Sequence, residues 1–291
     1  MPASERIPQG SMTVPEVLDV LAHGRLGLAG RLTSASNAVF YGHAEAGGER
    51  LPCVWKPVAG ERPLWDFPEG TLAGREVAAF EICRALGWDF VPPTVLREGP
   101  HGPGMCQQWV GPLPDRAEEA GTGAADRDGG GAALLRLVDG DEPGPGWRAV
   151  GHARLDGGRT ALLVHADDQR LRRLAAFDAV INNGDRKGGH LIPLPDGRMH
   201  AIDHGVSLHT EDKLRTLLWG WAGEPLPGDV AAALRGLAGR LAEGSPLSLR
   251  LAELITKPEL AALRARTEAL LAAGRHPEPG GDWPAIPWPP V

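Results

Sequence analysis

Short apolar stretches alternate with polar turns along the N-terminal part of the chain. Residues 14–23 (VPEVLDVLAH) carry apolar side chains at positions 14, 17, 18 and 21, which is the spacing of one helix face. The segment RLGLAGRLTSASNAVFYGHAE predicts two strands around a polar turn, and LPCVWKPV predicts a third strand. A short helix followed by a run of strands is therefore expected here.

A second helix is expected in LAGREVAAFEICRALGW, because apolar residues recur at helical spacing and Gly87 supplies a stop signal. Two more strands are predicted in VPPTVLRE and GPGMCQQWV, on either side of the turn GPHG. Strands, one helix and further strands are typical of a compact α+β lobe. We place this lobe at residues 14–111, after a flexible N-terminus at 1–13.

Residues 112–146 interrupt this pattern. They are dominated by Gly, Pro, Asp, Glu and Ala, a composition that cannot pack a core, and so predict a flexible acidic insertion between two lobes. A strand is predicted at TALLVHA, and DDQRLRRLAAFDAVI carries apolar residues at helical spacing after its acidic start. This predicted helix leads directly into the polar loop NNGDRKGGH.

Two short strands, HLIPL and MHAIDHG, flank the turn PDGR and predict a hairpin with polar residues at both ends. The chain that follows is largely helical in pattern, so residues 147–275 are expected to form a second, mainly helical lobe. Residues 276–291 are rich in Pro and Trp and predict an extended tail on the surface.

The composition is that of a globular protein with a sizeable core. Of 291 residues 42% are hydrophobic, and no apolar run approaches the roughly 20 residues that span a bilayer. The formal charge of -7 argues against a nucleic-acid partner or a polybasic membrane surface and, without a signal-peptide pattern, predicts a cytoplasmic protein. Cys53, Cys83 and Cys106 are widely spaced, which predicts reduced, buried thiols.

Four residues have the chemistry of a phosphoryl-transfer site. That reaction needs a cation on the phosphates, carboxylates for Mg²⁺ and a group that orients the attacking hydroxyl. Lys56 lies in the strand VWKP, and Glu76 lies one helix later. Asp185 occupies a polar loop that contains glycine, and Asp203 ends a short strand. Each residue alone is a weak signal, since strand lysines are usually surface residues, but their order along the chain indicates one catalytic cleft.

The loops NNGDRKGGHLI and MHAIDHG resemble the catalytic and metal-binding loops of the phosphatidylinositol 3- and 4-kinase (PI3/4-kinase) superfamily. VWKP followed by EGTLAGREVAAFEICRALGWDFVPPTVL is similar to the lysine strand, glutamate helix and next strand of the type II phosphatidylinositol 4-kinases. From residue 14 to about residue 270, the chain resembles an actinobacterial family related to those kinases. The resemblance implies a two-lobed, protein-kinase-like α+β fold of the PI3/4-kinase type, with a small strand-rich N-lobe and a mainly helical C-lobe.

The same resemblance implies the site and its cofactors. ATP with Mg²⁺ or Mn²⁺ would be bound, and the γ-phosphoryl group would pass to a hydroxyl. Asp185 would be the catalytic base with Arg186 beside it, and Asp203 would be a metal ligand. Nucleotide contacts are implied for Lys56, its partner Glu76, the turn at Ser34 and Ser36, and backbone groups of Gln107 and Val110.

Two departures from the superfamily pattern bear on catalysis. The second metal ligand is usually Asn, five residues after the catalytic Asp, whereas this position is His190 here. Because Mg²⁺ prefers oxygen ligands, an imidazole favours Mn²⁺ or a single metal ion. The phosphate turn TSASNAV also lacks glycine, so its cradle would depend on Ser and Asn groups. A nucleotide-binding pseudokinase or sensor is therefore the main alternative.

Two further hypotheses belong to other classes. His190, His200, His204 and His209 lie close together in sequence beside Asp203, as in a His/Asp metal-dependent hydrolase, although strand alternation separates His200 from Asp203. A binding module is the second, with a protein partner at the Trp219/Trp221 segment, for which core packing is the simpler explanation. For a kinase, the few basic residues after IDHG favour a small-molecule or protein hydroxyl over a lipid acceptor.

Overall fold

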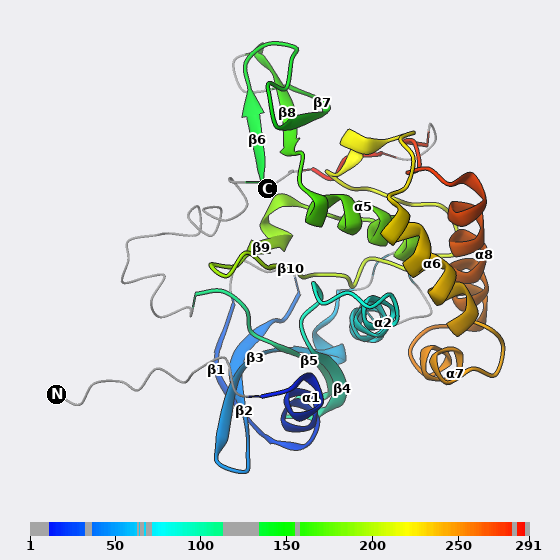
Figure 1. Ribbon diagram of the computed structural model, residues 1–291. Coiled ribbons are helices and arrows are strands. Elements are labelled where there is room, and N and C mark those ends of the chain that lie inside the picture. Colours follow the sequence, from blue (N-terminus) through cyan, green and yellow to red (C-terminus); the bar gives the residue numbers. More distant parts are fainter. Residues whose placement is uncertain are drawn as a thin grey trace. The chain divides into compact units, whose positions relative to one another are not determined.

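The computed structural model describes residues 12–32, 37–62, 64, 67, 72–112, 134–154, 158–280 and 284–288 (Figure 1). The chain divides into two units, and each is described by itself. Unit 1 comprises residues 1–62 and 93–109, and unit 2 comprises residues 63–92 and 110–291. The sequence placed the whole of 14–111 in one lobe, whereas the second predicted helix groups with unit 2.

Unit 1 is built on a five-stranded antiparallel sheet. All five strands were expected from the sequence. A two-residue turn joins the second and third strands, and its residues Gly47 and Gly48 both have positive φ, as a tight hairpin requires. In sheet order the strands are β1 (Arg25–Arg31), β2 (Phe40–Ala46), β3 (Glu49–Pro57), β5 (Gly102–Gln108) and β4 (Thr94–Gly99).

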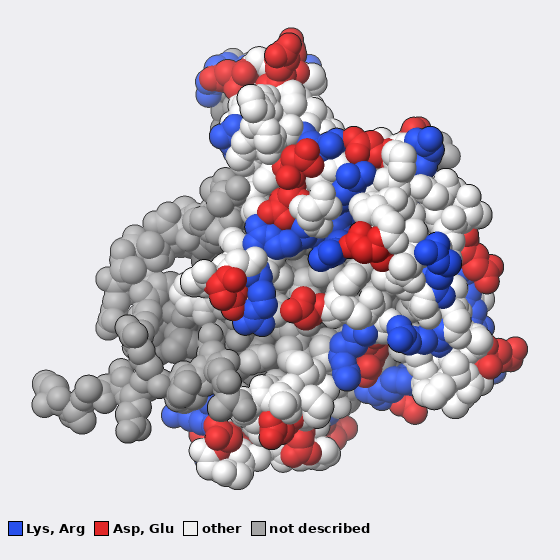
Figure 2. All heavy atoms as spheres, in the orientation of Figure 1, with Lys and Arg blue, Asp and Glu red and all other residues white. Residues whose placement is uncertain are grey.

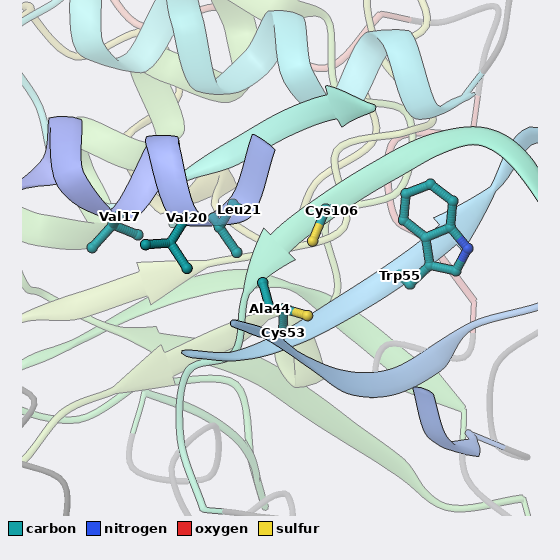
Figure 3. Packing of buried hydrophobic residues seen from close by; sticks show 7 residues of the cluster. All are labelled: Val17, Val20, Leu21, Ala44, Cys53, Trp55 and Cys106. Atoms are coloured by element: carbon teal, nitrogen blue, oxygen red, sulfur yellow. The ribbon is translucent and has the colours of Figure 1, made fainter. Parts of the chain in front are cut away.

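The predicted first helix, α1 (Val14–His23), supplies the core of unit 1. It begins after Thr13, whose main-chain N–H and hydroxyl both donate to the Glu16 carboxylate. The 3-10 helix η1 (Val58–Gly60) follows β3. The apolar face of α1 packs on one face of the sheet. Figure 3 shows the buried cluster that results: Val17, Val20, Leu21, Ala44, Cys53, Trp55 and Cys106.

The three cysteines are free and buried, as the sequence predicted. Burial raises the pKa of the Cys83 thiol to about 12. The pKa of Cys106 is also raised, because its thiol is hydrogen-bonded to Cys53 and buried. The Cys83 and Cys106 thiols therefore stay protonated and unreactive at neutral pH.

Unit 2 contains a three-stranded sheet that the sequence did not predict in full. The order is β6 (Leu135–Val138), β8 (Thr160–Ala166), β7 (Trp147–Arg154), and both pairs are antiparallel. Only β8 was expected. Because β6 lies within residues 112–146, describing that whole stretch as a flexible insertion was wrong. Residues 113–133 of it lie outside the described residues.

The central helix of unit 2, α5 (Gln169–Ile181), is confirmed. The side chain of Asp168 caps its first turn by accepting from Arg170 N. The predicted hairpin is also present, as β9 (Leu191–Pro193) paired with β10 (Met199–Ala201). The remaining elements of unit 2 are α2 (Leu72–Ala85), η4 (Gly188–His190), η5 (Trp219–Trp221), α6 (Gly228–Arg240), α7 (Pro246–Ala252) and α8 (Lys257–Ala273).

Trp219 and Trp221 are packed inside unit 2. Trp221 is fully buried, lies 4.3 Å from the His165 ring between centroids and donates from Nε1 to Asp167. The Trp219 indole is 8% exposed and donates to Ala285 O. The two indoles thus contribute to the core and present little aromatic surface. The exposed tryptophan in the described residues is Trp288, at 67%.

The charged surface of unit 2 carries both signs. Figure 2 shows basic and acidic side chains interspersed on the face in view. Arg173 with Asp229 (2.7 Å) and Arg172 with Glu224 (3.1 Å) are ion pairs of this unit. Among the helices that the structure describes, none has the length and apolar character needed to cross a membrane.

Two buried histidines make the stability of unit 2 sensitive to pH. Burial lowers the pKa of His165 and of His276 to about 4 in each case. The unfolded chain has the ordinary value of about 6.5, so it binds more protons than the folded chain between these values. The contribution of these two histidines to the free energy of unfolding is therefore fully present above pH 6.5 and is lost as the pH drops toward 4.

We expect the free energy of unfolding, measured with urea, to be lower at pH 5 than at pH 7. His165 alone should account for about 1–2 kcal/mol of this difference. In His276→Gln the loss between the two pH values should be smaller. The exposed His23 provides the matched control, His23→Gln, which should leave the loss unchanged. An identical pH dependence in His276→Gln and the wild type would contradict this explanation.

Candidate active site

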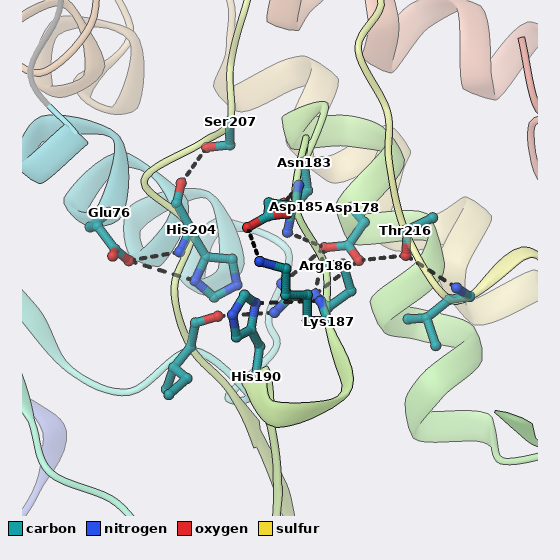
Figure 4. A network of polar contacts seen from close by, with 12 residues as sticks. Glu76, Asp178, Asn183, Asp185, Arg186, Lys187, His190, His204, Ser207 and Thr216 are labelled. Atoms are coloured by element: carbon teal, nitrogen blue, oxygen red, sulfur yellow. Dashed lines mark hydrogen bonds and ion pairs between the residues drawn. The ribbon is translucent and has the colours of Figure 1, made fainter. Parts of the chain in front are cut away.

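A polar loop directly after α5 forms the centre of the site (Figure 4). The helix ends at Asn182, whose left-handed conformation (φ 53°) turns the chain sharply. The Asn183 side chain then accepts from Asp185 N at 3.0 Å and donates to Asp178 at 3.0 Å. These side-chain contacts hold the backbone of the loop that carries Asp185.

Asp178 and Arg186 form an ion pair beneath this loop, and both side chains are 0% exposed. Arg186 donates from Nη2 to Asp178 Oδ1 (3.0 Å) and from Nε to Oδ2 (3.1 Å). Its Nη1 donates to Ile202 O, directly before Asp203, at 3.0 Å. Arg186 therefore links the two loops, and the catalytic role that the sequence assigned to it stays a prediction.

Asp178 was missed at the sequence level. Its signal was a lone carboxylate in the apolar helix segment LAAFDAVI, next to the buried Phe177. A charged group that faces the core needs a partner. Here Arg186 supplies the charge and Thr216 Oγ1 donates a further hydrogen bond at 3.3 Å.

The Asp185 carboxylate contacts two cations. Lys187 Nζ lies 3.0 Å from Oδ2, and Arg215 Nη2 lies 3.4 Å from Oδ1. Each of the three side chains is about a quarter exposed, so the cluster reaches solvent. Asp185 thus has a fixed orientation and an accessible carboxylate, as a group that accepts a proton from a bound hydroxyl requires.

Asp203 and His190 come together at the second loop. Asp203 follows β10 with φ 62°, and its half-exposed carboxylate lies 3.4 Å from His190 Nε2. Ile202 N donates to His190 O at 3.0 Å, which fixes the two segments side by side. Burial lowers the pKa of the His190 imidazole, so its neutral form, the form that binds metal ions, prevails.

Glu76 of α2 lies beneath the Asp203 turn. Its carboxylate is 2% exposed and accepts from His204 N at 2.9 Å. The His204 ring packs edge-on against Phe177, with 5.7 Å between centroids. Glu76 therefore holds the backbone next to Asp203. Its expected pairing with Lys56, which belongs to unit 1, stays a prediction.

The remaining residues expected to bind the nucleotide differ in their burial and contacts. Lys56 is half-buried in β3 opposite Met105, on the sheet face away from α1, as strand alternation predicts. Gln107 is buried in β5, and its side-chain amide donates to Thr94. Val110 of unit 2 follows the end of β5. Ser34 and Ser36 lie outside the described residues.

The main chain of Gln107 belongs to the sheet. Trp109 N donates to Pro52 O, and antiparallel hydrogen-bonded pairs recur every second residue. The pair Val54 and Gln107 is therefore a hydrogen-bonded pair of the β3–β5 ladder. The main chain of Gln107 is thus engaged in the sheet, and the adenine contacts expected of Gln107 and Val110 stay predictions.

His200 and His209 each contact a main-chain group. His200 contacts Phe90 O at 3.2 Å through Nδ1, and His209 accepts from Glu211 N at 3.0 Å. Within the described ranges, no group of three His, Cys, Asp or Glu side chains is arranged to hold a metal ion. The part of the chain that the structure describes therefore shows no multi-histidine centre of the kind that the hydrolase hypothesis requires.

The described residues form a strand-rich first unit and a second unit in which helices predominate. No family model matches the chain. The chain is 47% identical over 270 residues to "Protein Rv2133c" of Mycobacterium tuberculosis. This alignment covers 93% of the chain and 94% of that protein. The chain belongs to the family of that protein.

Three solved structures are similar at low sequence identity. The Golgi casein kinase aligns with 89% of this chain and 75% of its own (TM-score 0.44, 13% identity). Hydra Fam20 with sugar aligns with 89% and 87% (TM-score 0.44, 14%). The Helicobacter pylori proinflammatory kinase CtkA aligns with 88% and 94% (TM-score 0.43, 9%). Each TM-score is below 0.5, so these likenesses carry no functional argument.

Proposed function

We propose that the protein is an ATP-dependent phosphotransferase of the PI3/4-kinase type, which transfers the γ-phosphoryl group to a hydroxyl of a small molecule or protein. The observation that carries this proposal is the buried Asp178–Arg186 pair. It bonds the Asp185 loop and, through Ile202 O, the segment that carries Asp203. Two carboxylates from separate loops are thereby fixed by one support, which suits a reaction that depends on positioning and charge.

Asp185 is assigned the role of base for the acceptor hydroxyl. It is half-buried, its backbone is held by Asn183, and its carboxylate contacts Lys187 and Arg215. The two neighbouring cations offset negative charge where phosphate oxygens would accumulate. Lys56 is assigned to the ATP phosphates. Its ammonium group extends from β3 on the sheet face that points away from α1, and an ammonium has the charge that a phosphate contact requires.

Asp203 and His190 are assigned to the metal ion. A carboxylate oxygen and a neutral imidazole nitrogen 3.4 Å apart form a mixed donor set, which suits Mn²⁺ better than Mg²⁺. When bound, the ion would neutralise charge on the phosphate oxygens. Glu76 would preserve the Asp203 turn through its bond to His204 N.

A nucleotide-binding pseudokinase is the second candidate function. It is favoured by His190 itself, since an imidazole at the second metal position is a poor ligand for Mg²⁺. A phosphotransferase and a pseudokinase would both bind ATP, but only the phosphotransferase would turn it over. They are therefore separated by measuring binding and transfer on the same preparation.

The test is calorimetric titration of ATP with Mn²⁺ or Mg²⁺, together with ADP release and γ-phosphate transfer to candidate hydroxyl acceptors. We expect wild type to bind ATP more tightly with Mn²⁺, and Asp203→Asn to lose at least about tenfold in metal-dependent affinity. His190→Asn should shift the preference toward Mg²⁺. The proposed site would be contradicted if ATP bound equally well with and without the metal ion and with the same affinity in Asp203→Asn as in wild type.

A further inference from the structure

The C-terminal segment Pro284–Trp288, called the strap below, is bonded to the middle of unit 2. Ala285 O accepts two hydrogen bonds, from Thr216 N at 3.0 Å and from Trp219 Nε1 at 2.8 Å. Ile286 packs against β7, where a Cβ added to Gly151 would lie 3.3 Å from Ile286 Cδ1. The strap thus fixes the main chain at Thr216.

The chain at Thr216 is in turn bonded to the Asp185 loop. Arg215 N donates to Asn183 O at 2.8 Å, and Arg186 N donates to Arg215 O at 3.0 Å. Arg186 and Thr216 form an isolated parallel bridge. Thr216 Oγ1 also donates to Asp178, the buried carboxylate beneath the loop. Main-chain and side-chain bonds therefore connect the two segments on both sides.

Arg215 extends this connection to the proposed base. Its Nε donates to Gly184 O at 2.8 Å, and its Nη2 contacts Asp185 at 3.4 Å. The position of this guanidinium depends on the Arg215 main chain. That main chain is hydrogen-bonded to the Asp185 loop, and the next residue, Thr216, is hydrogen-bonded to the strap. A shift at Thr216 would accordingly move a cation that contacts the Asp185 carboxylate.

We propose that the strap is a positioning element of the catalytic loop, acting through Thr216 and Arg215. The catalytic part of this inference rests on the proposed function. Its structural part, that the strap and the Asp185 loop are coupled, holds independently of any reaction. Since Thr216 is 2% exposed and its amide is bonded to Ala285 O, the amide reports directly on whether the strap is docked.

The experiment introduces Ile286→Asp in the full chain, which places a charge in the packed contact with β7. Amide hydrogen exchange should quicken at least about tenfold at Thr216 and also at Arg186, while α5 stays protected. Phosphoryl transfer should show a kcat at least about tenfold lower with an unchanged KM for ATP. Ile286→Val should retain wild-type exchange and kcat. Trp288→Ala, at an exposed strap position, should do so as well.

Faster exchange at Thr216 with unchanged exchange at Arg186 would overturn the coupling, as would an equal loss of kcat in Trp288→Ala. If wild type binds ATP without turnover, the proposed function fails, and the exchange result still decides the inference about the strap. If Ile286→Asp loses the wild-type circular dichroism, Trp219→Phe, which removes one donor to Ala285 O, replaces it in the same comparison.

Discussion

Replacing Asp178 by asparagine should lower the free energy of unfolding by about 3–5 kcal/mol, because Arg186 would remain as a buried cation without its counter-charge. Both side chains are fully buried, so water cannot solvate the unpaired charge in the folded state. The measurement is urea denaturation at pH 7 followed by circular dichroism. The midpoint should fall while the slope with urea stays constant.

Two variants make this prediction specific. Asp229→Asn breaks the exposed ion pair with Arg173 and should cost less than about 1 kcal/mol. The double variant Asp178→Leu/Arg186→Met replaces the pair by apolar side chains and should recover much of the lost stability. A loss in Asp178→Asn no larger than that in Asp229→Asn would show that the pair is unimportant for the fold.

Replacing Asp185 by asparagine should reduce phosphoryl transfer by about 10²–10⁴-fold, since an amide cannot accept the proton of the acceptor hydroxyl. Asp185 contacts the partly exposed Lys187 and Arg215, so the melting temperature should change little. ATP affinity measured by calorimetry should stay within about twofold, because Lys56 and Asp203 remain.

The matched control for this variant is Asp196→Asn, a carboxylate in the β9–β10 turn that pairs with Arg198 on the surface. It should transfer phosphate at the wild-type rate. Turnover in Asp185→Asn equal to that of Asp196→Asn would remove Asp185 from the mechanism, even if ATP binding were intact.

Long, regular patterns were the part of the fold that sequence could predict. The helices α1, α2 and α5 carry apolar residues at helical spacing, and the unit 1 strands are bounded by Gly and Pro turns. The β9–β10 hairpin was recognisable from its turn PDGR. Each of these signals is local, so a reading along the chain is sufficient to find it.

The three-stranded sheet of unit 2 was harder to predict. β6 is the four-residue strand LRLV, with Leu137 44% exposed, in a neighbourhood rich in Gly and Asp. Its stability comes from pairing with β8, whose paired residues lie 24 to 30 positions further along the chain. Short strands of this kind are defined by their partners more than by their own composition.

The candidate site shows the same division. Asp185 and Asp203 stood out because each ends a recognisable element in a polar loop. The contacts of Asp178 and Glu76 could not be predicted, because Asp178 bonds Thr216 38 residues later and Glu76 bonds His204 128 residues later. No local pattern encodes such distant partners.

The bonds of α2 also bear on how the protein is made. Arg75 donates to Ser207 O, 132 residues further on, and forms a buried ion pair with Glu259, 184 residues further on. The contact with Glu259 involves α8, so it forms only after that helix has left the ribosome. A nascent chain that already exposes Asp185 and Asp203 therefore lacks the completed α2 contacts. Synthesis through α8 therefore precedes completion of the α2 contacts.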